Sequence, residues 1–223
     1  MTRTANARIA GFTFLFYIAA GMTSLMLFRR ATEGDAMADR LASIAGHAGD
    51  VGVLVLLGFA QCFSALVLGV TLWAITRDQD ADLAMLGLAC RVGEGIIAGL
   101  SIPTTLAVFS LASSAGNDAS TSAAAQTLAG YLLRQDVALP ATFFAVGSAA
   151  FSWLLLRGRL IPIPLAWLGV VASALLVVCL PLQLAGFFSG PFAMLMWLPM
   201  LAFEVPLGLW LLARGVAPSR VLT

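Results

Sequence analysis

A pair of opposite charges lies inside an apolar stretch that is long enough to cross a membrane. The stretch is LAMLGLACRVGEGIIAGLSIPTTL, residues 83–106, and it contains Arg91 and Glu94. Two side chains three residues apart lie on the same face of a helix. A charged side chain at the centre of a bilayer costs roughly 3 kcal/mol on insertion scales. This face must therefore lie against protein or water, and the rest of the chain has to supply its surroundings.

The composition indicates an integral membrane protein. Hydrophobic residues make up 61% of the sequence and charged residues only 10%, whereas soluble domains average about 25% charged residues. The formal net charge of +1 provides no basic stripe for a nucleic acid, so the lipid bilayer is the expected partner. Because lysine is absent while alanine and glycine are abundant, we expect a bacterial source with a GC-rich genome.

Six apolar runs each have the ~20 residues that a helix needs to span a bilayer. They predict an all-α polytopic bundle of six transmembrane helices, forming a single integral membrane domain over residues 1–223. The third run is longer than necessary, which predicts a tilt, a kink at Pro103 or an extension beyond the bilayer. Short interfacial helices are expected within 29–50 and 114–136, where apolar residues recur at helical spacing. The predicted spans cover residues 8–28, 51–75, 81–113, 137–156, 165–188 and 192–213.

The arginines are unevenly divided between the two sides of this arrangement. Seven fall on the side that holds both termini and four on the opposite side. Because cytoplasmic loops of membrane proteins carry an excess of basic residues, we expect both termini in the cytoplasm of a bacterium, with the protein in its inner membrane. The first apolar run of about 20 residues exceeds the 7–15 residues of a signal-peptide core, so we expect it to be retained as a span.

Further polar residues lie within the other predicted spans. Glu204 is in the sixth span, Gln61 is in the second and Gln183 is in the fifth. A rise of 1.5 Å per residue places Arg91 and Glu94 about 14–18 Å deep, near the bilayer midplane, and Glu204 at a similar depth. The sequence therefore predicts a polar intramembrane binding site made of these five residues.

The charges of this site do not balance if one arginine and two glutamates all ionise. Either one glutamate carries a proton or a cationic ligand completes the site. Intramembrane ionisable residues are functional-site candidates by default, so the first hypothesis is a small transporter or a ligand- or lipid-sensing module with a small polar or lipid ligand. The alternative is a structural or interaction subunit of a membrane complex, in which Arg91 and Glu94 only fix helix packing.

The sequence contains no motif that points to catalysis or to a cofactor. It lacks the HExxH, GxSxG, P-loop and dinucleotide-binding patterns. His47 is the only histidine, which is too few for sites built on several histidine ligands. The cysteines lie far apart within predicted spans and without CxxC spacing. We expect no metal, no cofactor and no catalytic residue, and the sequence leaves the oligomeric state open.

Several motifs occur in a fixed order along the chain. They are ARIAGF at 7–12, the R-x-x-E of Arg91 and Glu94, FF at 143–144, RGRLIPIPLAWLGV at 157–170, and FEVPLGLWLLARG at 203–215, which contains Glu204. In this order they resemble the domain-of-unknown-function 4386 family of uncharacterised bacterial multi-pass proteins. The resemblance covers nearly the whole chain and implies a bacterial membrane protein of six helices. It implies no activity.

Overall fold

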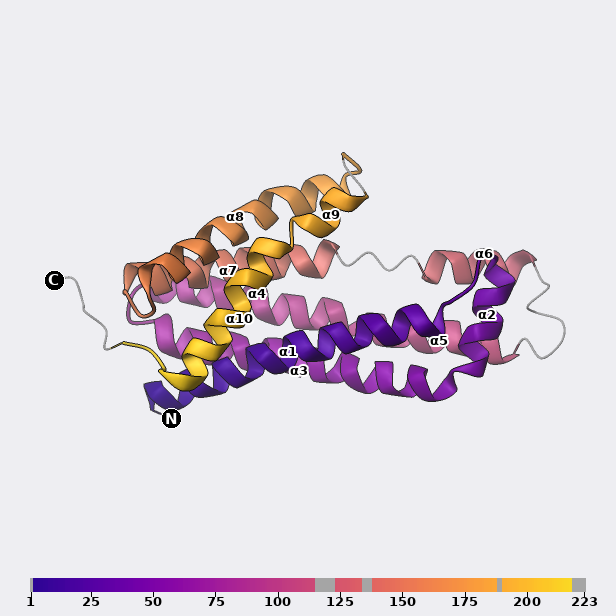
Figure 1. Cartoon of the computed structure of the whole chain (residues 1–223), viewed down its shortest axis with the longest axis horizontal. Helices are drawn as coiled ribbons and strands as arrows, with labels where there is room; N and C mark the ends of the chain where they lie inside the picture. Colours follow the sequence, from indigo (N-terminus) through magenta and orange to yellow (C-terminus); the bar gives the residue numbers. More distant parts are fainter. Residues whose placement is uncertain (1, 115–122, 134–137, 188–189, 218–223) are drawn as a thin grey trace. The chain divides into compact units, whose positions relative to one another are not determined.

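The computed structural model describes residues 2–114, 123–133, 138–187 and 190–217. All regular secondary structure within these ranges is helical, as Figure 1 shows. The helices are α1 (Arg3–Ala31), α2 (Met37–Gly46), α3 (Ala48–Thr76), α4 (Ala81–Gly99), α5 (Ser101–Ser114), α6 (Ala123–Leu132), α7 (Ala138–Arg157), α8 (Ile163–Leu184), α9 (Pro191–Leu195) and α10 (Leu198–Ala213).

The described residues contain six helices that are long and apolar enough to cross a membrane. These candidate spans are Arg3–Ala31, Ala48–Thr76, Ala81–Ser113, Ala138–Arg157, Ile163–Leu184 and Ala193–Ala213. The all-α fold with six predicted spans is therefore confirmed. Helices α2 and α6 lie in the two connections where short helices were expected. Their position at a membrane surface stays a prediction, and 115–122 and 134–137 lie outside the described residues.

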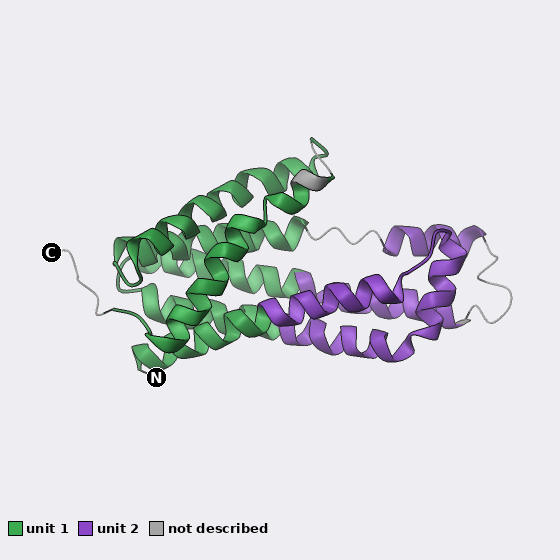
Figure 2. Ribbon diagram, viewed as in Figure 1, with its two compact units in different colours: residues 1–17, 63–97, 137–223 green, residues 18–62, 98–136 purple. Residues whose placement is uncertain are grey.

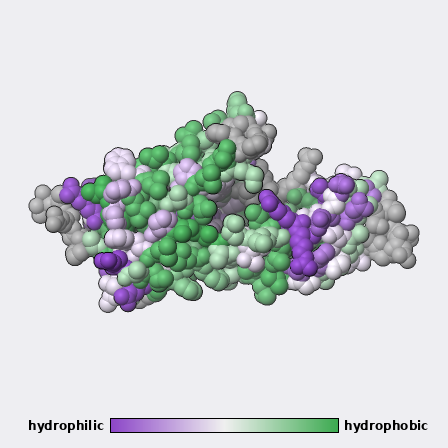
Figure 3. Space-filling view, in the orientation of Figure 1, coloured by the Kyte–Doolittle hydropathy of each residue, from purple (hydrophilic) through white to green (hydrophobic). Residues whose placement is uncertain are grey.

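The surface of the helices is largely apolar. In Figure 3, apolar residues cover much of the visible face, and hydrophilic residues gather near the N-terminal end of α1 and over part of unit 2. Large apolar side chains such as those of Phe12, Leu56 and Val171 are 60% or more exposed. A protein in water rarely exposes such extensive apolar surface, whereas lipid chains cover it without loss.

The chain forms two compact units, shown in different colours in Figure 2. Unit 1 comprises residues 1–17, 63–97 and 137–223, and unit 2 comprises residues 18–62 and 98–136. Helices α1, α3 and α4 each contribute residues to both units. Each unit has its own buried apolar cluster. The expectation of a single membrane domain stays a prediction.

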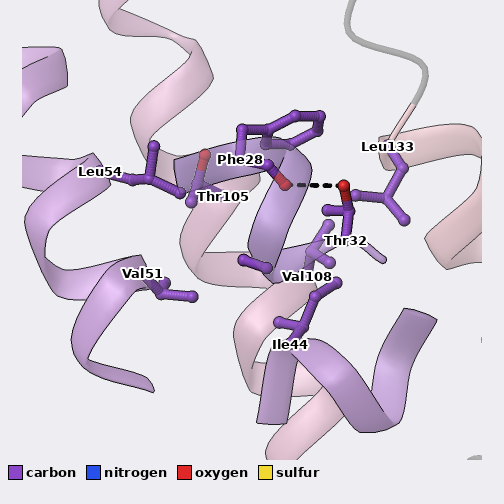
Figure 4. A pocket seen from close by; sticks show the side chains of 9 residues that line it. Phe28, Thr32, Ile44, Val51, Leu54, Thr105, Val108 and Leu133 are labelled. Atoms are coloured by element: carbon purple, nitrogen blue, oxygen red, sulfur yellow. Dashed lines mark hydrogen bonds between the residues drawn. The ribbon is translucent and has the colours of Figure 1, made fainter. Parts of the chain in front are cut away.

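Unit 2 contains a small apolar recess, drawn in Figure 4. Its volume is about 20 Å³, which is room for little more than one water-sized group. The hydroxyl of Thr32 donates to the Phe28 carbonyl at 2.7 Å, and that of Thr105 donates to the Ser101 carbonyl. Because both hydroxyl protons are already used, the recess offers no free donor. It is lined by Phe28, Ala31, Thr32, Ile44, Val51, Leu54, Thr105, Val108 and Leu133.

In unit 1, α8 packs against both α7 and α10, and α10 also meets α1 at a very close crossing. A Cβ atom added to Gly11 of α1 would lie 2.5 Å from the backbone nitrogen of Leu212 and 2.6 Å from the carbonyl oxygen of Gly208. Only glycine allows two helix backbones to approach so closely, as at other small-residue contacts between membrane helices. This crossing fixes α10, which carries Glu204, against α1.

Two of the spans are interrupted next to a proline. Helix α4 ends at Gly99 and α5 begins at Ser101, because Pro103 has no N–H to donate to the Gly99 carbonyl and its ring crowds that turn. The third span is therefore interrupted near Pro103, where a kink was one of the three expected possibilities. Pro199 interrupts the sixth span in the same way, so that α9 ends at Leu195, four residues earlier.

The fifth span ends earlier than the sequence pattern predicts. It was expected to continue to residue 188, but α8 ends at Leu184, and 188–189 lie outside the described residues. Gly186 adopts a φ of 82°, its N–H donates to the Gln183 carbonyl, and the Phe187 N–H donates to the Leu182 carbonyl. This pair of bonds is the Schellman motif, which ends a helix at a left-handed glycine.

Candidate intramembrane polar site

Arg91 and Glu94 lie on the buried face of α4, as their spacing predicts. The buried residues of the helix recur every three or four positions. Small residues at Gly87 and Gly95 share this face and allow neighbouring helices to come close. The Arg91 side chain is 1% exposed and the Glu94 side chain is 3% exposed. The buried residues of α4 are Ala84, Gly87, Cys90, Arg91, Glu94 and Gly95.

Both oxygens of the Glu94 carboxylate accept a short hydrogen bond. The Nη1 atom of Arg91 donates to Oε2 at 2.9 Å, and the hydroxyl of Tyr17 in α1 donates to Oε1 at 2.7 Å. Hydrogen bonds to an ionised acceptor are shorter and stronger than those between neutral groups. Glu94 is therefore well stabilised as a carboxylate and is held on two sides.

Glu204 reaches the same arginine from α10 but is held much more loosely. Its Oε1 atom lies 3.8 Å from Nη2 of Arg91, which is an ion-pair distance and too long for a hydrogen bond. Among the described residues, no hydrogen bond reaches the Glu204 carboxylate. Its side chain is 9% exposed, so this acid has lost most of its contact with the surroundings of the protein without gaining a short bond.

Aromatic rings and a hydroxyl complete the surroundings of Arg91. Its Nη2 atom donates to the hydroxyl oxygen of Ser148 at 3.2 Å. The centre of the Phe144 ring lies 4.6 Å from the guanidinium carbon and that of Phe14 lies 5.8 Å from it, distances at which a cation is attracted to the ring face. The buried Nε atom has no hydrogen-bond partner among the described residues.

The chain is similar to one known family of proteins. The chain matches the family described as Domain of unknown function (DUF4386) over residues 9–215. The protein belongs to this family. Neither a curated protein nor a solved structure shows a match to the chain. The family description assigns no activity. The chemistry of the polar site therefore rests on the residues of this chain.

All members of the cluster lie within the part of the chain that matches the DUF4386 family. These are Tyr17, Arg91, Glu94, Ser148 and Glu204, all of which belong to unit 1. The structure thus brings together three of the five residues predicted from the sequence. It adds a tyrosine and a serine that were not predicted from the sequence.

Neither of the two glutamines predicted for the site makes a hydrogen bond to Arg91, Glu94 or Glu204 among the described residues. Gln61 belongs to unit 2, where its amide donates to the Ser24 hydroxyl at 3.0 Å and to the Leu57 carbonyl at 3.4 Å. Gln183 lies near the end of α8, and its buried Oε1 atom has no hydrogen-bond partner among the described residues. No hydrogen bond in the described part of the chain links Gln183 to Arg91, so a binding role for either glutamine stays a prediction.

The missed residues carry only a faint signal in the sequence. Tyr17 is one of two tyrosines in the chain and lies in the middle of the first apolar run, whereas tyrosine in membrane proteins is enriched at the interfaces. A tyrosine at such a depth needs a partner for its hydroxyl, and Glu94 provides it. Ser148 follows a glycine in α7 and has no comparable signal, because serine is common where membrane helices pack.

The cluster contains groups of opposite charge that are held with different strengths. It has one fixed cation, one tightly held carboxylate and one loosely held carboxyl group. The described residues contain no group of three or more His, Cys, Asp and Glu side chains that could hold a metal ion.

Proposed function

We propose that the protein is a small transporter or sensing module of the bacterial inner membrane, whose polar site binds and releases a positively charged ligand. The observation that carries this proposal is the poor bonding of Glu204. It lies 3.8 Å from Arg91 and receives no hydrogen bond from the described residues. A buried carboxylate in this state is costly, and binding a cation or a proton relieves that cost.

The charge count supports the same conclusion. Arg91 is paired at 2.9 Å with Glu94, so its charge is already largely balanced before Glu204 is considered. An ionised Glu204 therefore leaves one negative charge in an interior where charges are only weakly screened. A purely structural site has no need for this second acid, whereas a site that loads and unloads a cation needs a carboxyl group of this kind.

The setting of the site is proposed from the sequence. Six candidate spans support a multi-pass membrane protein. The arginine distribution favours both termini in the cytoplasm, following the positive-inside rule. In this orientation the connections that contain α2 and α6 face the outside of the cell.

The proposal is tested by thermal unfolding of the purified protein in lipid nanodiscs. The probes are protons, NaCl, KCl and choline chloride, the salts being compared at equal ionic strength. Any cation that binds the folded state alone stabilises it by mass action. We expect the unfolding temperature to depend on at least one of these cations, and we expect Glu204→Gln to fold and to lose that dependence. An unchanged dependence in Glu204→Gln contradicts the proposal.

The chain provides its own control for this experiment. Besides Glu94 and Glu204, the chain has one further glutamate, Glu33, which lies exposed in the connection between α1 and α2. Because Glu33→Gln removes the same charge at a solvated position, we expect it to keep the cation response of the wild type. Loss of the response in both variants points to a general charge effect and argues against a specific site.

The second candidate function is a structural or interaction subunit, and the tight bonding of Glu94 favours it. Tyr17 and Arg91 both donate to this carboxylate, and Arg91 also donates to the Ser148 hydroxyl, at distances of 2.7–3.2 Å. A buried ion pair that only fixes packing can often be replaced by apolar residues without loss of stability. If the double variant Arg91→Leu with Glu94→Leu matches the wild type in stability and no cation changes the unfolding temperature of the wild type, the structural role is the correct one.

A further inference from the structure

The Glu204 carboxyl group has few neighbours in the cluster that could act as ligands for a metal cation. This inference rests on the proposed function and concerns the identity of the positively charged ligand. Hard cations such as Mg²⁺ and Ca²⁺ take six or more oxygen ligands. In the cluster, both oxygens of Glu94 already accept hydrogen bonds, and the hydroxyl oxygen of Ser148 accepts one from Arg91.

The neighbour of Glu204 in this cluster is itself a cation. The guanidinium of Arg91 lies 3.8 Å from its carboxylate, and it repels any further metal ion placed between the two side chains. A proton does not need several oxygen ligands. It binds to a single carboxylate oxygen and neutralises the surplus negative charge on Glu204 itself. A protonated Glu204 also loses the cost of burying an ionised group.

The other titratable and polar groups around Glu204 are less suited than Glu204 itself to bind this proton. The charges that act on it are Arg91 and Glu94, both from α4. α1 contributes the hydroxyl of Tyr17, which is already donated to Glu94, and α7 contributes the hydroxyl of Ser148. Helix α8, which packs against α10, contains no acidic or basic residue, and Cys179 is its one titratable side chain.

The side-chain exposures agree with this assignment. Glu204 is 9% exposed, compared with 1% for Arg91 and 3% for Glu94. Of these three charged groups, Glu204 is therefore the one with an edge outside the packed interior. We propose that the ligand exchanged by this site is a proton and that it binds to the carboxyl group of Glu204, while Glu94 stays ionised between Arg91 and Tyr17.

The proposal is tested by infrared difference spectroscopy on the protein in lipid nanodiscs. Spectra are recorded between acidic and alkaline buffers, in H₂O and in D₂O, for the wild type, Glu204→Gln and Glu94→Gln. In parallel, the unfolding temperature is measured in NaCl and in choline chloride at constant pH. We expect a D₂O-sensitive carbonyl band of a protonated carboxylic acid in the wild type, its loss in Glu204→Gln, and no effect of sodium.

The remaining outcomes separate the failures of the two proposals. A band that persists in Glu204→Gln and disappears in Glu94→Gln moves the proton to Glu94 and overturns the assignment. A sodium-dependent unfolding temperature that Glu204→Gln abolishes, without a Glu204 band, makes the ligand a metal cation and leaves the proposed function intact. A wild type with neither the band nor a cation response overturns both. If Glu94→Gln does not fold, the wild type and Glu204→Gln still decide whether Glu204 carries the band.

Discussion

At the scale of single residues, the stability of the cluster depends on how completely each buried polar group is bonded. Glu94 accepts short hydrogen bonds from Arg91 and Tyr17, whereas Glu204 has only an ion pair with Arg91 at 3.8 Å among the described residues. A buried donor or acceptor that loses its partner costs more than the net value of the hydrogen bond, because the group left behind stays desolvated. The two acids are therefore expected to respond very differently to mutation.

The hydroxyl of Tyr17 gives the first residue-scale prediction. Tyr17→Phe removes a 2.7 Å bond to Glu94 and leaves one carboxylate oxygen buried without a donor, so we expect a loss of about 1–3 kcal/mol of unfolding free energy. Reversible unfolding in mixed lipid–detergent micelles measures this loss. Tyr131→Phe is the matched control, because Tyr131 is the other tyrosine of the chain and is 76% exposed. Equal stabilities of the two variants contradict the assigned role of Tyr17.

The sequence predicts part of this cluster and misses the rest for identifiable reasons. The i, i+3 spacing of Arg91 and Glu94 is a local signal, so their shared face is predictable. Glu204 follows from depth, because few other ionisable residues lie near the middle of an apolar run. Tyr17 and Ser148 meet the cluster only through tertiary packing, which leaves no periodicity in the sequence. The depth argument that selected Glu204 also selected Gln61, whose described hydrogen bonds go to Ser24 and Leu57 instead.

At the scale of helices, close packing of glycine positions the elements that carry the site. Gly11 of α1 faces Gly208 and Leu212 of α10. A Cβ atom added to Gly11 would come within 2.6 Å of a backbone atom of each of these two residues. Protein interiors have no spare volume at such contacts. The position of Glu204 on α10 therefore depends on a residue far from it in the sequence.

Alanine substitution at this crossing should therefore destabilise the protein. Gly11→Ala forces α1 and α10 apart, and we expect a loss of about 1–3 kcal/mol from overpacking. Gly52→Ala is the control, because Gly52 lies in α3 with nothing within 4 Å of an added Cβ. There the usual preference for alanine in a helix predicts a gain of about 0.5–1 kcal/mol. The same unfolding measurement on both variants should give opposite signs, and a stabilising Gly11→Ala disproves the close crossing.

The helix bounds show which sequence signals are reliable. The interruptions at Pro103 and Pro199 follow from the missing proline N–H. The early end of α8 depends on Gly186 at a φ of 82°. Its neighbours in the sequence are apolar enough to continue a span, so hydropathy alone extends the predicted helix too far. Backbone conformation decides this boundary, and hydropathy does not report on it.

At the scale of the whole molecule, the number of spans and the family are the most predictable features. Six apolar runs predict six spans, and six helices of suitable length occur in the described residues. The match to the DUF4386 family covers residues 9–215. The division into two compact units was not predicted, because it arises from contacts between helices that are far apart in the chain.

The orientation in the membrane is a prediction for the whole molecule. In a background with Cys62, Cys90 and Cys179 replaced by alanine, single cysteines are introduced by Asp35→Cys and Asp78→Cys, at two exposed connections on opposite predicted sides. With both termini in the cytoplasm, a membrane-impermeant maleimide should label Asp35→Cys in spheroplasts and Asp78→Cys only after lysis. The reverse pattern inverts the orientation, and equal labelling of both in spheroplasts contradicts the count of spans between them.

The central claim is that Glu94 is a fixed carboxylate whereas Glu204 carries an exchangeable charge. The most direct test is the unfolding free energy of Glu94→Gln and Glu204→Gln, measured side by side in lipid at neutral pH. Glu94→Gln breaks the 2.9 Å pair with Arg91, and we expect it to lose about 3–5 kcal/mol. Glu204→Gln resembles the protonated acid, and we expect it to match or exceed the wild type. A loss in Glu204→Gln as large as that in Glu94→Gln would show that both acids are fixed partners of Arg91.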